Sequence, residues 1–211
     1  MTLPRNAPDT NPLFIKICGL RTAEAVDACV ALHVDAVGFV FAESSPRTID
    51  PAAARDLVKR LPPSVEAVGV FRNAPLDTIV AQVAQAGIGT AQLHGSYSDD
   101  QVQELESHGL RVIRALSVSE YVRDDQPSGR VLIDGDDPGS GAEFPADLLA
   151  GVDLPAEWIL AGGLTPANVA RRVRELAPSG VDVSSGVESS RGTKSVELIR
   201  EFVHEARASS S

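Results

Sequence analysis

The stretch Phe14-Ile15-Lys16-Ile17-Cys18-Gly19-Leu20 decides the fold. It is a short, largely apolar run with β-branched residues, and it ends in a cysteine and a glycine before a helix-like pattern. Side chains alternate between the two faces of a strand, so Phe14, Lys16 and Cys18 share one face and aliphatic residues share the other. The aliphatic face suits packing against helices. A face with a lysine and a thiol predicts that this first strand places a chemical group at its end.

Seven further apolar runs follow at regular spacing, and each is separated from the next by a helix-like pattern. Helix starts are predicted at Thr22, at Asp50 with Pro51, at Pro75, at Thr165 with Pro166, and at Ser195. The later strands are predicted at 34–41, 65–71, 90–94, 111–116, 130–134, 158–162 and 180–185. Eight such units indicate an α/β protein, a single-domain (β/α)8 TIM barrel. A doubly wound open sheet is the alternative, although it rarely needs eight evenly spaced units.

Composition limits the remaining possibilities. We expect a loosely attached N-terminal arm at 1–12, the barrel at 13–206 and a frayed tail at 207–211. A hydrophobic content of 43% supports a sizeable core, and the net charge of −10 argues against a nucleic-acid partner. The two cysteines make neither a disulfide framework nor a metal cluster, and no run resembles a signal peptide or a membrane span. We therefore expect a cytoplasmic protein with no membrane partner, a monomer, with a homodimer as the alternative.

Unusual residues gather at the predicted carboxyl ends of the strands, where barrel enzymes place their chemistry. These candidates are Cys18, Arg47, Gln92, His94, Asp134, Gly162, Gly163, Asp182, Ser185 and Gly186. Gln92, His94 and Asp182 are candidates for substrate binding. The pairs Gly162-Gly163 and Ser185-Gly186 follow the seventh and eighth strands, where backbone amides often hold phosphate. Two ordinary glycine turns are the alternative.

Two residues are predicted to face each other across the barrel mouth. Asp134 shares a face with Leu132 and ends an inward row, so it is a candidate proton donor, with a loop or capping aspartate as the alternative. Cys18 is a candidate for proton transfer, although many free cysteines are simply buried, as we expect for Cys29. A nucleophilic pair of Cys18 with His94 is also possible, but no third, orienting group is evident.

Charged residues yield two further predictions. Arg47 offers a planar fork suited to a carboxylate, although a solvated surface arginine is the alternative. The first and eighth strands are neighbours in a closed barrel, and Lys16 and Asp182 both face inward. We therefore predict an internal ion pair between them, because neither charge would tolerate burial alone.

Several ordered motifs together resemble one enzyme family. They are Lys16-Ile17-Cys18-Gly19, Ser45-Pro46-Arg47, Gln92-Leu93-His94-Gly95, Ala161-Gly162-Gly163-Leu164-Thr165-Pro166 and Asp182-Val183-Ser184-Ser185-Gly186-Val187-Glu188. From residue 14 to about 202 the chain resembles the phosphoribosylanthranilate isomerases of tryptophan biosynthesis. No single motif is unique to that family, but the ordered set is specific.

The resemblance implies an aldose–ketose isomerase that performs an Amadori rearrangement. N-(5-phosphoribosyl)anthranilate would become 1-(2-carboxyphenylamino)-1-deoxyribulose 5-phosphate. By the same resemblance, Asp134 would be the general acid that opens the ribose ring and Cys18 the general base that removes the C2 proton. Arg47 would hold the anthranilate carboxylate, and the backbone at Gly163 and at Ser185-Gly186 would hold the phosphate. No cofactor or metal is implied, because the substrate nitrogen acts as the electron sink.

Rival functions depend on the same residues. The histidine-pathway isomerase performs the same rearrangement on a related barrel, but its family has aspartate where Cys18 stands. A sugar-phosphate epimerase would be expected to show metal-ligand histidines and acids at strand ends. A barrel that binds phosphate without catalysis is the non-enzymatic alternative. The loop at 135–144 departs from the family pattern, which leaves its ligand contacts open.

Overall fold

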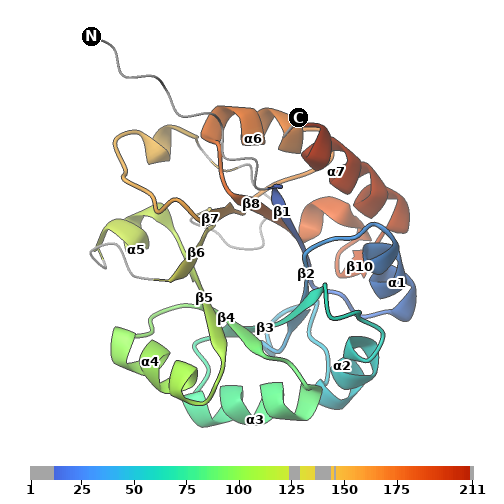
Figure 1. Cartoon of the computed structure of the whole chain (residues 1–211), viewed down its shortest axis with the longest axis vertical. Helices are drawn as coiled ribbons and strands as arrows, with labels where there is room; N and C mark the ends of the chain where they lie inside the picture. The colour runs from blue at the N-terminus through green and yellow to red at the C-terminus, as the bar shows by residue number, and fades with distance from the viewer. Residues whose placement is uncertain (1–11, 124–128, 136–143, 145, 210–211) are drawn as a thin grey trace.

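The computed structural model describes residues 12–123, 129–135, 144 and 146–209. Its eight parallel strands close into a barrel in chain order, with β1 paired to β8, and helices surround it (Figure 1). This closure confirms the (β/α)8 barrel and excludes the open sheet. The strands are β1 (Phe14–Cys18), β2 (Ala36–Val40), β3 (Glu66–Arg72), β4 (Thr90–His94), β5 (Arg111–Leu116), β6 (Arg130–Ile133), β7 (Trp158–Leu160) and β8 (Gly180–Val183).

Seven α-helices follow the strands within the described ranges, and only the 3-10 helix η1 lies between β6 and β7 there. A short antiparallel pair, β9 and β10, comes after β8 and was not predicted. The helices are α1 (Ala23–Ala31), α2 (Pro51–Val58), α3 (Leu76–Ala86), α4 (Asp99–Ser107), α5 (Val118–Arg123), α6 (Val169–Leu176) and α7 (Val196–Ala208). The short elements are η1 (Ala146–Leu149), η2 (Ser185–Val187), β9 (Glu188–Ser190) and β10 (Thr193–Lys194).

Most predicted helix starts are confirmed by their capping bonds. The side chains of Thr22 and Asp50 accept from backbone amides of the first turns of α1 and α2, and Ser195 does so for α7. The predicted start at Thr165 is wrong, because α6 begins at Val169. The reason is Asn168, whose side chain accepts from the amide of Thr165 at 2.8 Å and donates to the carbonyl of Gly163 at 2.9 Å. The backbone of Asn168, at φ −120°, lies outside the helical range and separates this turn from α6.

The alternation read from β1 places side chains on the predicted sides of the barrel wall. Ile15 and Ile17 belong to the core between the strands and the surrounding helices. Cys18 belongs to a second core inside the barrel, together with Leu132 of β6. Leu132 is the residue whose face Asp134 was predicted to share. The barrel interior is thus filled by side chains, and the pocket-lining polar residues lie toward the carboxyl ends of its rows.

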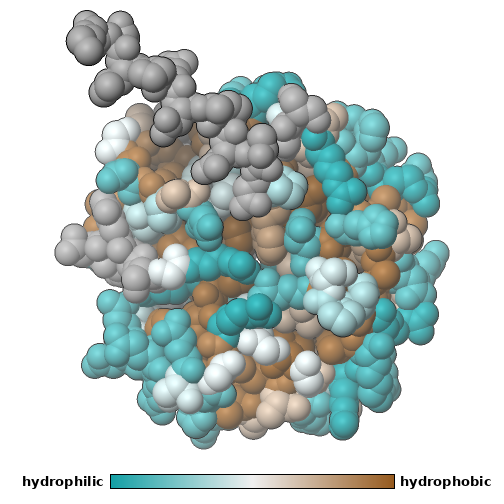
Figure 2. All heavy atoms as spheres, viewed as in Figure 1, coloured by the Kyte–Doolittle hydropathy of each residue, from teal (hydrophilic) through white to brown (hydrophobic). Residues whose placement is uncertain are grey.

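The predicted ends of the chain are only partly described. Of the arm at 1–12, all but residue 12 lies outside the described residues. The frayed tail expected from 207 needs correction, because α7 extends through Ala208 and Arg207 donates to the carbonyl of His33 at 2.7 Å. Over the described part of the chain, no helix has the length and apolar character needed to cross a membrane. Figure 2 shows hydrophilic residues spread around much of the outer rim of the molecule.

Candidate active site

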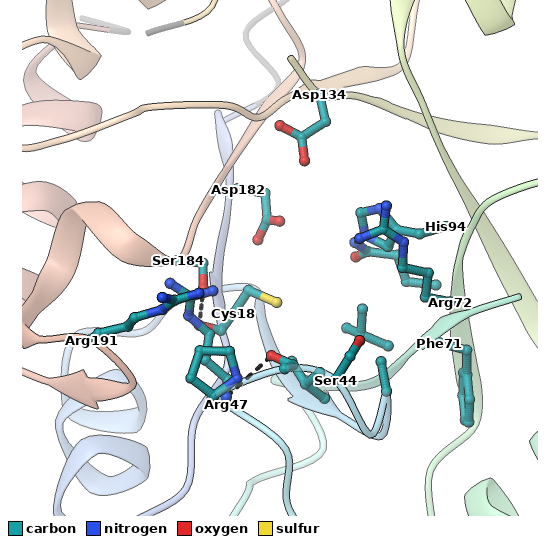
Figure 3. A pocket seen from close by; sticks show the side chains of 16 residues that line it. Cys18, Ser44, Arg47, Phe71, Arg72, His94, Asp134, Asp182, Ser184 and Arg191 are labelled. Atoms are coloured by element: carbon teal, nitrogen blue, oxygen red, sulfur yellow. Dashed lines mark hydrogen bonds between the residues drawn. The ribbon is translucent and has the colours of Figure 1, made fainter. Parts of the chain in front are cut away.

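One pocket of about 260 Å³ receives side chains from the carboxyl ends of several strands and from the loops that follow them (Figure 3). Of the predicted residues it is lined by Cys18, Arg47, Gln92, His94, Asp134 and Asp182. In Figure 3 the thiol of Cys18 and the carboxyl of Asp134 point into the pocket from opposite sides, with Asp182 between them. Residues from β1, β4, β6 and β8 that are far apart in sequence therefore meet in one site.

Cys18 is the last residue of β1 and is a buried, free thiol. Burial raises its pKa, and the charge of Lys16 opposes that rise. Cys29, the other cysteine, lies in α1 with no exposed surface, and burial raises its pKa to about 12. The two thiols thus lie where they were predicted, Cys18 on the wall of the pocket and Cys29 in the core.

The predicted ion pair between Lys16 and Asp182 is confirmed. The two residues are register partners on β1 and β8, and Lys16 Nζ lies 2.9 Å from Asp182 Oδ1. Lys16 has no exposed surface. Burial by itself would lower the pKa of Lys16, but the charges of Asp182 and Cys18 and the hydrogen bonds to both together outweigh it, so the pKa is raised. Lys16 is therefore a permanent cation beneath the pocket.

Asp134 directly follows β6, and its Oδ1 accepts a hydrogen bond from the amide of Gly135 at 2.8 Å. Burial raises the pKa of Asp134 to about 6, and the negative charge of Asp182 acts in the same direction. The loop after β7 passes close by, since a Cβ on Gly162 would come within 3.0 Å of this carboxyl. Gly162 has φ +88°, which favours glycine. Asp134 thus retains its proton at a higher pH than an ordinary aspartate.

Gln92 and His94 form a pair on one wall, with Gln92 Nε2 2.9 Å from His94 Nε2. Burial lowers the pKa of His94 to about 4, and the charge of Lys16 adds to this, so the imidazole is neutral. The hydrogen bond found for His94 joins it to Gln92 rather than to Cys18, which gives no support to a nucleophilic pair. Gln92 Oε1 is buried and has no partner among the described residues.

Arg47 is 8% exposed, so the surface reading of this residue is wrong. Its Nε and Nη2 donate to the two carboxylate oxygens of Glu188 at 2.7 and 3.1 Å. Glu188 also accepts from Lys194 Nζ at 2.8 Å and from the amide of Gly192 at 3.0 Å. Although burial opposes it, this set of donors lowers the pKa of Glu188 to about 2. Arg47 is thus held in place by a fixed anion.

Sequence reasoning missed several charged residues here. Glu188, Lys194 and Arg191 come from the unpredicted β9–β10 hairpin, and Arg72 is the last residue of β3. Arg191 and Arg72 line the pocket. The quoted motifs contained Glu188 but gave it no role. Gly192 at the hairpin turn, with φ +83°, was the available signal for a tight connection.

The four residues predicted to hold phosphate lie beside the pocket and do not line it, whereas Ser184 does. Gly162 and Gly163 have positive φ angles of +88° and +59°. A Cβ on Gly186 would collide with the carbonyl oxygen of Leu164. The loops after β7 and β8 therefore pack directly against each other.

Part of the predicted site lies outside the described residues. The loop at 135–144 is described only at its two ends, so its contacts at 136–143 are not defined. Among the residues that the structure does describe, no three His, Cys, Asp or Glu side chains are grouped as metal ligands.

The chain is similar to known proteins over most of its length. The family model described as N-(5′-phosphoribosyl)anthranilate (PRA) isomerase matches residues 15–205. The N-(5′-phosphoribosyl)anthranilate isomerase of Rhodospirillum rubrum is 41% identical over 218 residues, covering 92% of this chain and 97% of the relative. TrpF from Jonesia denitrificans has a TM-score of 0.82 and 39% identity, covering 94% and 98%. A phosphoribosyl anthranilate isomerase in complex with reduced 1-(o-carboxyphenylamino)-1-deoxyribulose 5-phosphate has a TM-score of 0.83 and 31% identity, covering 93% and 99%.

Proposed function

The chain belongs to the family of N-(5′-phosphoribosyl)anthranilate isomerases and is an enzyme of tryptophan biosynthesis, and we propose that Cys18 and Asp134 carry its proton transfers. The reaction is the Amadori rearrangement of N-(5-phosphoribosyl)anthranilate to 1-(2-carboxyphenylamino)-1-deoxyribulose 5-phosphate. The observation that carries the assignment is the placement of one thiol and one carboxyl on opposite sides of a single pocket. Membership of this family argues against the epimerase and the non-catalytic barrel.

Asp134 acts as the general acid in the first step. It gives its proton to the ribose ring oxygen, the C1–O bond breaks, and the nitrogen lone pair forms a Schiff base with C1. A pKa of about 6 supports this role, because roughly a tenth of such a group is still protonated at pH 7. General acids work best with a pKa near the operating pH. An ordinary solvated aspartate would rarely carry the proton.

Cys18 acts as the general base in the second step. Its thiolate removes the proton from C2, and the electrons of that C–H bond form the C1–C2 double bond while the iminium nitrogen is neutralised. The resulting enol-amine gains a proton at C1 and loses one from the C2 hydroxyl to become the ketone. The position of Cys18 at the end of an inward row supports this role, since it places the thiol on the wall of the pocket.

The two ends of the substrate are anions, and separate donors in the pocket and in the loops beside it bind them. Arg47 binds the anthranilate carboxylate, supported by its fixed orientation against Glu188. The backbone around Gly163 and Ser185-Gly186 binds the phosphate, supported by the packing of the two loops. Gln92, His94 and Asp182 line the ribose-binding region, where the unpartnered Gln92 Oε1 is an acceptor for a substrate donor.

The decay of phosphoribosylanthranilate fluorescence tests this proposal. We expect rapid decay with the wild-type chain and near-complete loss of turnover with Asp134→Asn and with Cys18→Ala. Glu197→Gln, in an exposed pair on α7, is the control and should keep wild-type turnover. Full activity in either pocket variant, with folded protein, would remove that residue from the mechanism.

We further propose that the enzyme is a cytoplasmic monomer. The two free cysteines support a reducing compartment. Among the described residues only Val122 and Leu148 are large, exposed hydrophobic side chains, which supports a surface without an obligate partner. Light scattering after size exclusion should give the mass of one chain, and a doubled mass would contradict the monomer.

A further inference from the structure

A buried cation lies directly beneath the thiol of the pocket. Lys16 and Cys18 are two residues apart on β1 and face the barrel interior together, and Lys16 has no exposed surface. We propose that Lys16 is a positioning residue of the reaction, which acts through Cys18 by stabilising its thiolate. This inference rests on the proposed role of Cys18 as the general base.

Gly38 gives the geometry of this pair. Gly38 on β2 is the register partner of Cys18, and an ideal Cβ built on it would lie 2.8 Å from Cys18 Sγ and 3.2 Å from Lys16 Nζ. Both atoms approach the same point, so the ammonium and the sulfur are at most about 6 Å apart. An opposite charge within ~4–6 Å favours the ionised form of a titratable group. A side chain at position 38 would occupy the space that these two atoms use.

Other charges also act on the Cys18 thiol, but among them Lys16 has the largest effect on its pKa. Asp182 of β8 acts in the opposite sense and holds Lys16 in place at 2.9 Å. Lys194 of β10 also favours the thiolate, although its ammonium is bonded to Glu188 at 2.8 Å and to the carbonyl of Ser184 at 2.7 Å. The remaining charged or titratable groups on the pocket walls are Arg47, Arg72, His94, Asp134 and Arg191.

A buried thiol needs such a cation to serve as a base. Burial penalises the thiolate, so without a counter-charge the thiol would stay protonated and could not accept the C2 proton. Lys16 itself stays charged, because Asp182 and Cys18 together offset its burial and raise its pKa. When the proton moves from C2 to sulfur, the thiolate becomes a neutral thiol. Asp182 is then the remaining anionic partner of Lys16. The ion pair with Asp182 thus keeps the ammonium buried and available to the sulfur.

The pH dependence of Cys18 alkylation tests the proposal without relying on turnover. Thiolate sulfur displaces iodide from iodoacetamide, and peptide mass mapping separates Cys18 from Cys29. In K16M/D182N both charges of the pair are removed, so no unpaired charge is buried. We expect this variant to hold roughly three- to tenfold less Cys18 thiolate at neutral pH than wild type. D182N alone should shift the thiolate fraction in the opposite direction.

Two controls make the result specific. Cys29 must remain unmodified, which shows that the barrel stays closed during the reaction. K194M/E188Q removes the other buried lysine with its partner and should change the Cys18 titration less than K16M/D182N does. An unchanged or increased thiolate fraction in K16M/D182N, or an equal effect in K194M/E188Q, would overturn the proposal. Full turnover in Cys18→Ala would instead refute the proposed base, whatever the alkylation shows.

Discussion

The guanidinium of Arg47 and the carboxylate of Glu188 are joined by two hydrogen bonds, from Nε at 2.7 Å and from Nη2 at 3.1 Å. Such a paired arrangement fixes the plane of the guanidinium as well as its position. Glu188 reaches Arg47 from β9, far along the chain, and also holds Lys194 and Gly192 of the same hairpin. One carboxylate therefore links the β2–α2 loop to the β9–β10 hairpin.

Replacement of Glu188 by glutamine tests this link. Because Arg47 would lose its fixed orientation, it must be ordered when substrate binds, and we expect KM to rise about tenfold with a smaller change in kcat. Steady-state kinetics measure both constants, and Glu197→Gln on the exposed face of α7 serves as the control. A lower KM would contradict the prediction and would mean that Glu188 competes with the substrate carboxylate for Arg47.

Asp134→Asn should raise the stability of the protein at the expense of its activity. The pKa of Asp134 is about 6 in the folded chain, against 3.8 for an unperturbed aspartate. Between these pH values the folded state keeps a proton that the unfolded state has lost, so wild-type stability falls as pH rises through this window. Asparagine does not titrate. At pH 8 we expect the variant to be more stable by about 1–2 kcal/mol, with no difference near pH 3, after allowance for solvent screening of the carboxyl.

Urea unfolding at the two pH values measures this difference. Asp56→Asn is the control, because that carboxyl is exposed and its substitution should leave the pH profile nearly unchanged. Equal stabilities of wild type and Asp134→Asn at pH 8 would contradict the prediction. They would show that burial of the ionised Asp134 carboxylate does not destabilise the folded protein.

Arg191 is predicted to contribute to substrate affinity. It lies at the turn between β9 and β10, lines the pocket, and points into it in Figure 3. Gly192 beside it packs against the carbonyl of Pro46, which places the hairpin turn against the loop that carries Arg47. Loss of one charged donor costs about 1.5–3 kcal/mol, so Arg191→Met should raise KM by roughly tenfold or more. Arg200→Met, in an exposed pair on α7, should leave KM unchanged.

Inhibition constants identify which anion Arg191 contacts. Weaker inhibition by anthranilate in Arg191→Met would assign it to the carboxylate, and weaker inhibition by inorganic phosphate would assign it to the phosphate. If neither inhibitor is affected and KM stays at the wild-type value, Arg191 has no part in binding.

Gly186→Ala should damage the site proposed for the phosphate. The added Cβ would collide with the carbonyl of Leu164, so the loops after β7 and β8 must separate. We expect KM to rise about tenfold and inorganic phosphate to inhibit correspondingly less, since each lost backbone donor to an anion costs ~1.5–3 kcal/mol. Gly89→Ala is the matched control, because a Cβ there meets nothing within 4 Å. A wild-type KM in Gly186→Ala would place the phosphate elsewhere.

The sequence predicted the barrel wall well because its signal is periodic. Apolar runs at regular spacing located all eight strands, and two of them, Thr90–His94 and Arg111–Leu116, have the predicted bounds. The Lys16–Asp182 pair was also predictable, because closure of the barrel makes the first and eighth strands neighbours. At these positions the residue pattern of each strand is consistent with the closed barrel that the strands form.

The β9–β10 hairpin could not be predicted in the same way. Its strands, Glu188–Ser190 and Thr193–Lys194, are too short and too polar to show a period. The start of α6 was predicted wrongly for a different reason. Thr165 followed by Pro166 is a valid capping signal, but the backbone of Asn168 lies outside the helical range and delays the helix to Val169. The site residues missed were those whose position depends on such loop contacts.

The Lys16–Asp182 bond joins residues that are 166 positions apart. During synthesis the first strand leaves the ribosome long before its partner, so a partly made chain that buried β1 would enclose an ammonium with no counter-ion. This penalty disfavours premature collapse around β1 and makes closure of the barrel a late event, which follows release of β8. The ion pair therefore ties the burial of β1 to the presence of β8.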